Sequence, residues 1–199
     1  LSVVLAALFL WRQRDIKRLF AYSSIEHMGI VTFAFGMGGA VANFAALLHM
    51  TVHSLTKSAI FFAVGHAAQK AGSQRIEDIR GLITLNPTIG WGLMIGSLAI
   101  LGMPPFGVFA SEFLILTTAM RQQPWATPIL LLALAVAFAA IFSRVQGMVF
   151  GETRGRRLPH QPALLPVFAH LAIVLVLGLY IPPYLADWYR AAARMIGGG

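Results

Sequence analysis

The sequence predicts an all-α integral membrane protein, a multi-span helix bundle. Hydrophobic residues make up 58% of the 199-residue chain and charged residues only 11%, whereas roughly a quarter of the residues of a soluble domain are charged. Apolar segments long enough to cross about 30 Å of hydrocarbon recur along the whole chain. The lipid bilayer is therefore the expected surroundings, and no separate soluble domain is expected.

The net charge of +8 does not indicate a nucleic-acid-binding protein. Basic residues lie in short clusters between apolar runs, at 12–18, 70–80 and 154–157, which is typical of membrane loops rather than of one basic face. These clusters predict the orientation in the membrane only weakly, because the third falls on the side opposite the other two. The chain has no cysteine, which excludes disulfides, zinc fingers and iron–sulfur ligation by these residues.

We expect a single transmembrane domain over residues 1–199, with six full helices after a truncated one. Leu1 lies inside an apolar run without the features of a signal peptide, and residues 1–11 are too short to cross a bilayer. The sequence is therefore interpreted as a piece of a longer protein. The full helices are expected at 18–37, 41–69, 87–103, 107–121, 125–150 and 163–182.

Charge, glycine and proline set the limits of the first three full helices. Arg12–Arg18 forms a charged turn before the first of them, and Gly36–Gly39 ends it. The polar loop Lys70–Leu85 follows the second. Pro87 then suits the first turn of the third, where its missing N–H is not needed.

The run Gly102-Met103-Pro104-Pro105-Phe106-Gly107 must interrupt the next helical stretch, because two prolines remove backbone donors and clash with the preceding turn. The segment 107–121 is short for a full crossing. The two pieces are therefore either separate spans or a discontinuous pair that meets at depth. After the last span, Ile181-Pro182-Pro183 leads into a short amphipathic segment whose Trp188 suits a membrane interface.

A stripe of ionisable side chains lies in the middle of the second full helix. His49, His53 and Lys57 follow at i, i+4 and i+8, so they share one helix face over about 12 Å. An ionisable group at this depth costs roughly 2.5–3.5 kcal/mol or more and commonly marks an ion or proton pathway. Histidine titrates near neutrality and burial weakens proton binding by lysine, so the stripe predicts a proton relay. Hydrogen bonding between helices is the alternative.

A metal site was also considered, since histidines at i and i+4 can share a zinc ion. The pair His49 and His53 has no glutamate beside its first member and no obvious third ligand in the sequence. We therefore expect no metal and no cofactor.

Four further residues are candidates for proton transfer. Glu112 follows the proline break among apolar residues, and its alternative role is to cap the amides of the broken helix. Glu26 and His27 lie more than two turns inside an apolar run, although Glu26 could pair with Arg18 on the helix surface. Composition alone assigns Lys17 to a solvated or interfacial cluster.

Three motifs resemble a known family. They are Asp-Ile-Lys-Arg-Leu-Phe-Ala-Tyr-Ser-Ser-Ile-Glu-His-Met-Gly at 15–29, the His-rich helix with its lysine at 49–62, and Gly-Met-Pro-Pro-Phe-Gly at 102–107 followed by Ser-Glu-Phe at 111–113. Their order resembles that of antiporter-like membrane subunits of respiratory complex I, multisubunit sodium/proton antiporters and hydrogenase-4 or formate hydrogenlyase complexes. The resemblance covers essentially the whole chain and corresponds to the C-terminal half of a fourteen-helix subunit. Ser-Ser-Ile-Glu-His-Met-Gly is most similar to the hydrogenase-4 F-type subunit.

The resemblance implies roles for individual residues. Lys57 would lie on a central hydrophilic axis, Glu112 would be a terminal proton site on the broken helix, and Lys17 would be the basic residue of the first motif. His49 and His53 would connect the central and terminal positions through water. The glutamate and lysine of the family's first half are not in this sequence, so these residues alone do not predict a complete channel.

The function that the resemblance implies is that of a non-catalytic, proton-translocating subunit of a redox-driven complex, in the inner membrane of a bacterium or archaeon. Its partners would be other membrane subunits, a peripheral redox arm, lipid and protons. A subunit of a sodium/proton antiporter is one alternative. A membrane scaffold that does not conduct protons is the other alternative. Substitution of Lys57 would distinguish a scaffold from a relay, because a scaffold should tolerate a polar uncharged replacement and a relay should not.

Overall fold

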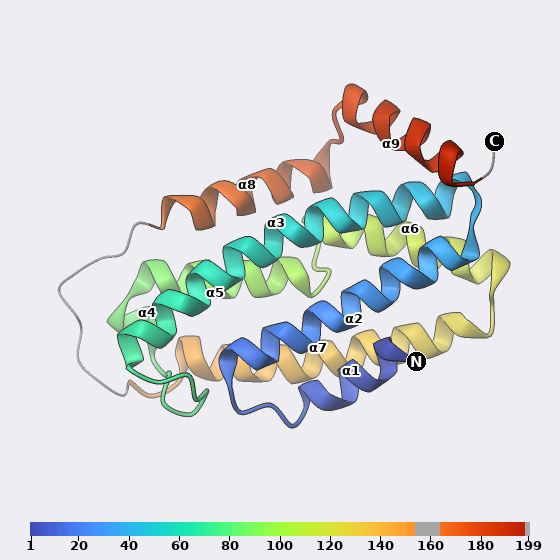
Figure 1. Ribbon diagram of the computed structural model, residues 1–199. Coiled ribbons are helices and arrows are strands. Elements are labelled where there is room, and N and C mark those ends of the chain that lie inside the picture. Colours follow the sequence, from blue (N-terminus) through green and yellow to red (C-terminus); the bar gives the residue numbers. More distant parts are fainter. Residues whose placement is uncertain (154–163, 198–199) are drawn as a thin grey trace.

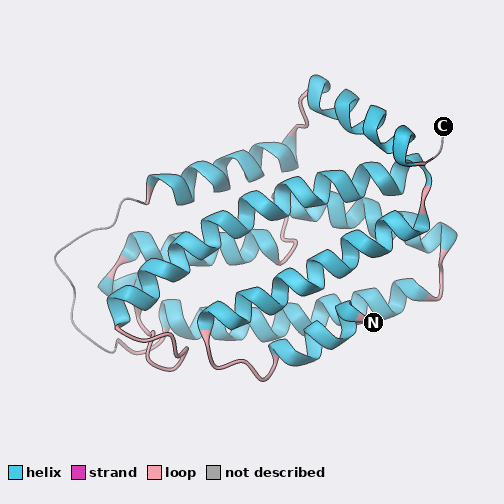
Figure 2. Ribbon diagram, viewed as in Figure 1, coloured by secondary structure: helices cyan, strands magenta, loops and turns pink. Residues whose placement is uncertain are grey.

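The computed structural model describes residues 1–153 and 164–197. All regular elements in these ranges are helices, and the only strand-like pairing there is an isolated bridge between Asp15 and Arg75 (Figure 2). The prediction of an all-helical chain is therefore confirmed for the described part. The basic cluster predicted at 154–157 and the first residue of the helix predicted at 163–182 lie outside the described residues.

The helices begin and end close to glycine, proline and charged turns. Asp15 caps the second helix, where its carboxylate accepts a hydrogen bond from the Arg18 N–H at 2.9 Å. The helices are α1 (Ser2–Leu10), α2 (Ile16–Met37), α3 (Gly39–Ala71), α4 (Leu82–Leu85), α5 (Pro87–Ile100), α6 (Gly107–Gln122), α7 (Ala126–Phe150), α8 (Leu165–Leu179) and α9 (Pro183–Ile196).

Helix α3 organises the bundle. It has 33 residues and packs against α2, α5, α6, α8 and α9, whereas α1 packs against α2 and α7, and α7 also packs against α5 (Figure 1). Small residues such as Ala42, Ala45, Ala59 and Ala63 are fully buried along it. Small side chains let neighbouring helices approach closely, which is how transmembrane helices usually pack.

Helices α5 and α6 lie end to end against α3 (Figure 1). Gly96 of α5 packs against Ile60, and Gly107 of α6 packs against Val52, so the two helices continue along α3 in the same direction. The sequence left open whether these pieces are separate spans or a discontinuous pair. This arrangement favours a discontinuous pair.

The break between them begins earlier than predicted. The helix expected over 87–103 ends at Ile100, because Gly102 adopts a positive φ of 67° and two prolines follow. Gly178 of α8 packs directly against the carbonyl of Pro105, where a larger side chain would collide. The break is thus held against α8 and lies beside the middle of α3.

Within residues 1–153 and 164–197, two helices, α3 and α7, are long and apolar enough to cross a membrane. Helices α8 and α9 meet the same test together, but they bend by 76° at the prolines between them. Helix α5 is apolar but shorter. The predicted total of six full spans therefore stays a prediction.

Candidate functional site

Six ionisable side chains meet at the centre of the bundle, beside the break between α5 and α6. Their exposed fractions range from 0% for His49 to 8% for Glu112. Burying so many polar groups is costly unless they contact one another. The six are Glu26 and His27 of α2, His49, His53 and Lys57 of α3, and Glu112 of α6.

Two histidines and a serine form a continuous line of hydrogen bonds across three helices. His27 Nδ1 lies 3.0 Å from His49 Nε2, and His49 Nδ1 lies 2.9 Å from Ser111 Oγ. The two imidazole rings are stacked with their centroids 5.2 Å apart. Because Ser111 sits just after the break, α6 joins this line at its first turns.

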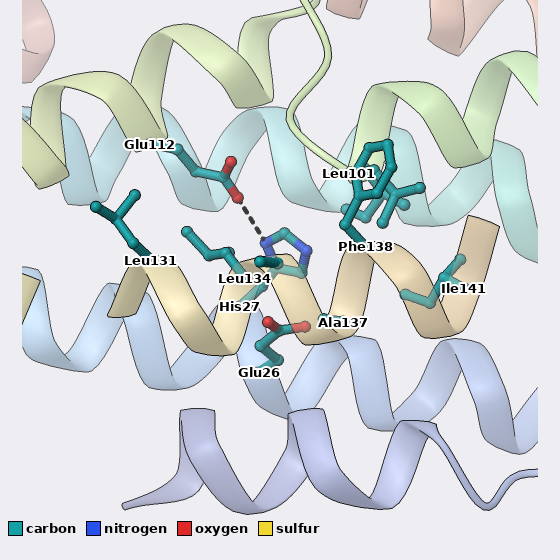
Figure 3. A pocket seen from close by; sticks show the side chains of 11 residues that line it. Glu26, His27, Leu101, Glu112, Leu131, Leu134, Ala137, Phe138 and Ile141 are labelled. Carbon is teal, nitrogen blue, oxygen red and sulfur yellow. Dashed lines mark ion pairs between the residues drawn. The ribbon is translucent and has the colours of Figure 1, made fainter. Parts of the chain in front are cut away.

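Glu112 points from α6 towards His27 (Figure 3). Its Oε1 lies 3.6 Å from His27 Nδ1. The other carboxylate oxygen packs against Gly102, which leaves room for it only because glycine has no Cβ. No backbone amide of the described residues donates a hydrogen bond to Glu112, so the geometry does not support the alternative in which Glu112 only caps the broken helix.

His53 lies next to the histidine pair. Its ring centroid is 5.2 Å from that of His27 and 6.2 Å from that of His49. Its Nε2 is buried and has no hydrogen-bond partner in the described residues. Since His53 is also one helical turn from Lys57 on α3, it lies next to both Lys57 and the His27 ring.

Lys57 Nζ donates a hydrogen bond of 2.7 Å to the carbonyl of Phe20 and lies 5.5 Å above the centre of the Phe20 ring. No carboxylate of the described residues forms a salt bridge with it. The ammonium is held by neutral groups, so its proton is not locked into an ion pair.

Glu26 is buried beside His27 and interacts electrostatically with both Lys57 and Glu112. Its Oε1 accepts no hydrogen bond from the described residues, and no salt bridge to Arg18 forms among them. Arg18 is exposed at the start of α2, so the surface pair considered for Glu26 is not formed.

Lys17 does not join the buried cluster. It is exposed in the first turn of α2 and lines a separate surface pocket together with Gln69 and Ser73. Its interfacial position therefore stays a prediction.

A cavity of about 360 Å³ opens onto the cluster. Glu26, His27 and Glu112 form its polar side, and α7 supplies apolar side chains including Leu131 and Phe138 (Figure 3). Because Leu131 is exposed at the bundle surface, the cavity connects the carboxylates with the outside of the described bundle. A space that is both polar and roomy can hold water.

The sequence pattern predicted the stripe on α3 but not the centre of the site. His27 contacts His49, His53 and Glu112, although it was the less prominent histidine in the sequence. Ser111 stood in a motif without a role of its own, and the structure makes it the partner of His49. A buried cluster that exchanges protons between titratable groups is the chemistry that this arrangement allows.

Comparison with known proteins gives both family and fold. The family model described as the transmembrane NADH:quinone oxidoreductase/Mrp antiporter family matches residues 1–143. The chain is 52% identical over 195 residues to the hydrogenase-4 component F homolog of Methylacidiphilum infernorum (isolate V4), covering 98% of this chain and 41% of that relative.

Solved structures of two respiratory membrane complexes contain chains with the same fold. In the membrane-bound sulfane sulfur reductase, an archaeal respiratory membrane complex, one chain superposes with a TM-score of 0.89 at 30% identity, covering 98% of this chain and 40% of the other. A chain of respiratory complex I from Thermus thermophilus has the same fold, with a TM-score of 0.85 at 24% identity, over 99% and 43% of the two chains. The chain therefore spans less than half the length of these similar proteins.

Proposed function

This chain belongs to the transmembrane family of NADH:quinone oxidoreductase and Mrp antiporter subunits, and from that membership we propose that it relays protons within a redox-driven membrane complex of the hydrogenase-4 type. One observation carries the proposal: the buried succession from Lys57 through the three histidines to Glu112. Ionisable groups at membrane depth are rare and are usually retained for function.

The geometry supports a stepwise relay. Lys57 can release a proton because its Nζ is hydrogen-bonded to a carbonyl and not paired directly with a carboxylate. His53 lies one turn away on the same helix and contacts the His27 ring. The His27–His49 pair passes the proton on, and Glu112 receives it beside the cavity. Because the groups interact, a charge change on one alters proton binding by the next.

The redox partner is proposed from the relatives. The relative with 52% identity is a hydrogenase-4 component F homolog, and the structure with 30% identity comes from an archaeal respiratory membrane complex. We propose that this chain contacts other membrane subunits, that a peripheral arm carries the electron transfer, and that the complex lies in the inner membrane of a bacterium or archaeon.

The test is proton uptake into inverted vesicles that contain the assembled complex. Lys57→Met and Glu112→Gln should each lower uptake about a hundredfold or more, the order expected when a proton-transfer group is lost. His170→Gln is the matched control, because His170 lies on α8 and bonds to the Pro166 carbonyl of its own helix, outside the cluster.

Two outcomes would contradict the proposal. If both variants assemble and pump at the wild-type rate, the cluster is a scaffold that holds helices together. If uptake requires a sodium gradient and continues without redox turnover, the chain is part of a sodium/proton antiporter and has no redox role.

A further inference from the structure

The centre of the cluster has the donor set of a metal site. We propose that His27 Nδ1, His49 Nε2 and Glu112 Oε1 bind a divalent transition-metal ion, and zinc fits best. The three ligand atoms lie within 4.8 Å of one another, with His27 Nδ1 3.0 Å from His49 Nε2 and 3.6 Å from Glu112 Oε1. Ligand atoms around tetrahedral zinc are about 3.3 Å apart, given Zn–N distances near 2.0–2.1 Å.

The hydrogen bond to Ser111 orients His49 for a metal. The Ser111 hydroxyl donates to its own helix, to the carbonyls of Val108 at 2.9 Å and Gly107 at 3.2 Å. With that proton on its own helix, the Ser111 oxygen is free to accept from His49 Nδ1, and we assign the His49 proton to this nitrogen. The lone pair of His49 Nε2 consequently faces His27, as in metal sites whose histidines are fixed by a second hydrogen bond.

His27 faces His49 through its Nδ1, which lies 3.0 Å from His49 Nε2. A neutral imidazole carries its proton on one nitrogen and a lone pair on the other. A cation between the two rings would replace the single hydrogen bond with coordination from both nitrogens, His27 using the lone pair of Nδ1 and keeping its proton on the other nitrogen.

Glu112 supplies the anionic ligand. Its Oε1 is buried and has no hydrogen-bond partner in the described residues, so it can accept a cation without losing a bond. A second carboxyl group, that of Glu26, lines the same cavity as Glu112 and His27. The cavity beside Glu112 and His27 gives an ion a route in and leaves space for a water as the fourth ligand.

This set differs from the i, i+4 pair that the sequence suggested. The His49 and His53 ring centroids are 6.2 Å apart, and His53 is not one of the three clustered ligands. The missing ligands come from α2 and α6, so no spacing within one helix could reveal them.

The binding test uses the purified complex with Zn²⁺ and with Co²⁺ as a spectroscopic probe. Calorimetry should show one site per subunit that is weakened at least about tenfold in His27→Gln and His49→Gln. Bound Co²⁺ should give the absorption of a tetrahedral ion in the wild type and in the control His170→Gln. Glu112→Gln, which is nearly isosteric, provides a third ligand variant should a histidine variant fail to assemble.

The proposal is overturned if assembled ligand variants bind Zn²⁺ with the stoichiometry and affinity of the wild type. Inhibition is a second, separate readout and rests on the proposed relay, since a metal would occupy the lone pairs that exchange protons. Zinc that binds without slowing proton uptake would contradict the relay but keep the site. Uptake that depends on Lys57 in a complex that binds no zinc would contradict the metal site and keep the relay.

Discussion

His27 Nδ1 on α2 lies 3.0 Å from His49 Nε2 on α3, and this contact joins helices whose histidines are 22 positions apart in the sequence. Through its other ring nitrogen His49 reaches Ser111 on α6. Three helices therefore share one line of hydrogen bonds beside the break between α5 and α6. Both proposed functions of the cluster depend on this line, because it brings the His27 and His49 nitrogens within hydrogen-bond distance and orients the His49 ring.

Replacing Ser111 with alanine should disturb the cluster without removing an ionisable group. The buried His49 N–H would lose its acceptor, which costs about 1–3 kcal/mol, and the His49 ring would be free to change tautomer. We expect slower proton uptake and weaker Zn²⁺ binding in Ser111→Ala. Both are measured on the assembled complex, together with thermal unfolding in detergent.

Two variants make this test specific. Ser111→Thr keeps the hydroxyl and should restore uptake and metal binding. Ser54→Ala removes an exposed hydroxyl that bonds to the Met50 carbonyl of its own helix, and it should change neither. If Ser111→Ala behaves like Ser54→Ala, Ser111 does not position His49.

The parts of the site that the sequence predicted are those set by spacing along one helix. His49, His53 and Lys57 recur every four residues, so any helix places them on one face. The meeting of His27 with His49 depends on how α2 packs against α3, and no local pattern contains that information. Lys17 shows the same limit, since its motif resembles a family position but its side chain is exposed in the first turn of α2.

The fold, like the site, could be predicted from the sequence only in part. Composition and the length of the apolar segments predicted an all-helical membrane protein, and the family resemblance is confirmed by the match over residues 1–143. Proline and glycine also predicted the break after α5. The end-to-end course of α5 and α6 along α3 was not predictable, because it arises from contacts such as Gly96 with Ile60 between distant segments.

Gly102→Ala should impair the site through Glu112. Gly102 has a φ of 67°, and an added Cβ would collide with the Glu112 carboxylate. Backbone strain in this region costs about 1–2 kcal/mol, and the displaced carboxylate would leave His27. We expect a lower unfolding temperature, slower proton uptake and weaker Zn²⁺ binding.

Gly72→Ala is the control that separates the effect of backbone strain from the effect of displacing the Glu112 carboxylate. Gly72 has nearly the same φ, 66°, but no atom lies within 4 Å of its added Cβ. This variant should show the loss of stability and keep normal uptake and metal binding. Equal uptake in the two variants would mean that contact with Gly102 does not hold Glu112 in place.

Tyr189→Phe should loosen α9 from α3 and leave the buried cluster intact. Tyr189 Oη donates to Thr51 Oγ1 at 2.5 Å, and its ring packs edge-on against Phe44 at 5.8 Å. Phenylalanine keeps the ring packing and loses only the hydrogen bond, which contributes about 0.5–1.5 kcal/mol. Amide exchange in α9 should therefore be about 2- to 12-fold faster, measured by mass spectrometry. Tyr184→Phe is the control, because Tyr184 is 76% exposed on the same helix. Unchanged exchange in Tyr189→Phe would show that Phe44 and the bond from Asn43 to the Ala193 carbonyl are enough to hold α9 on α3.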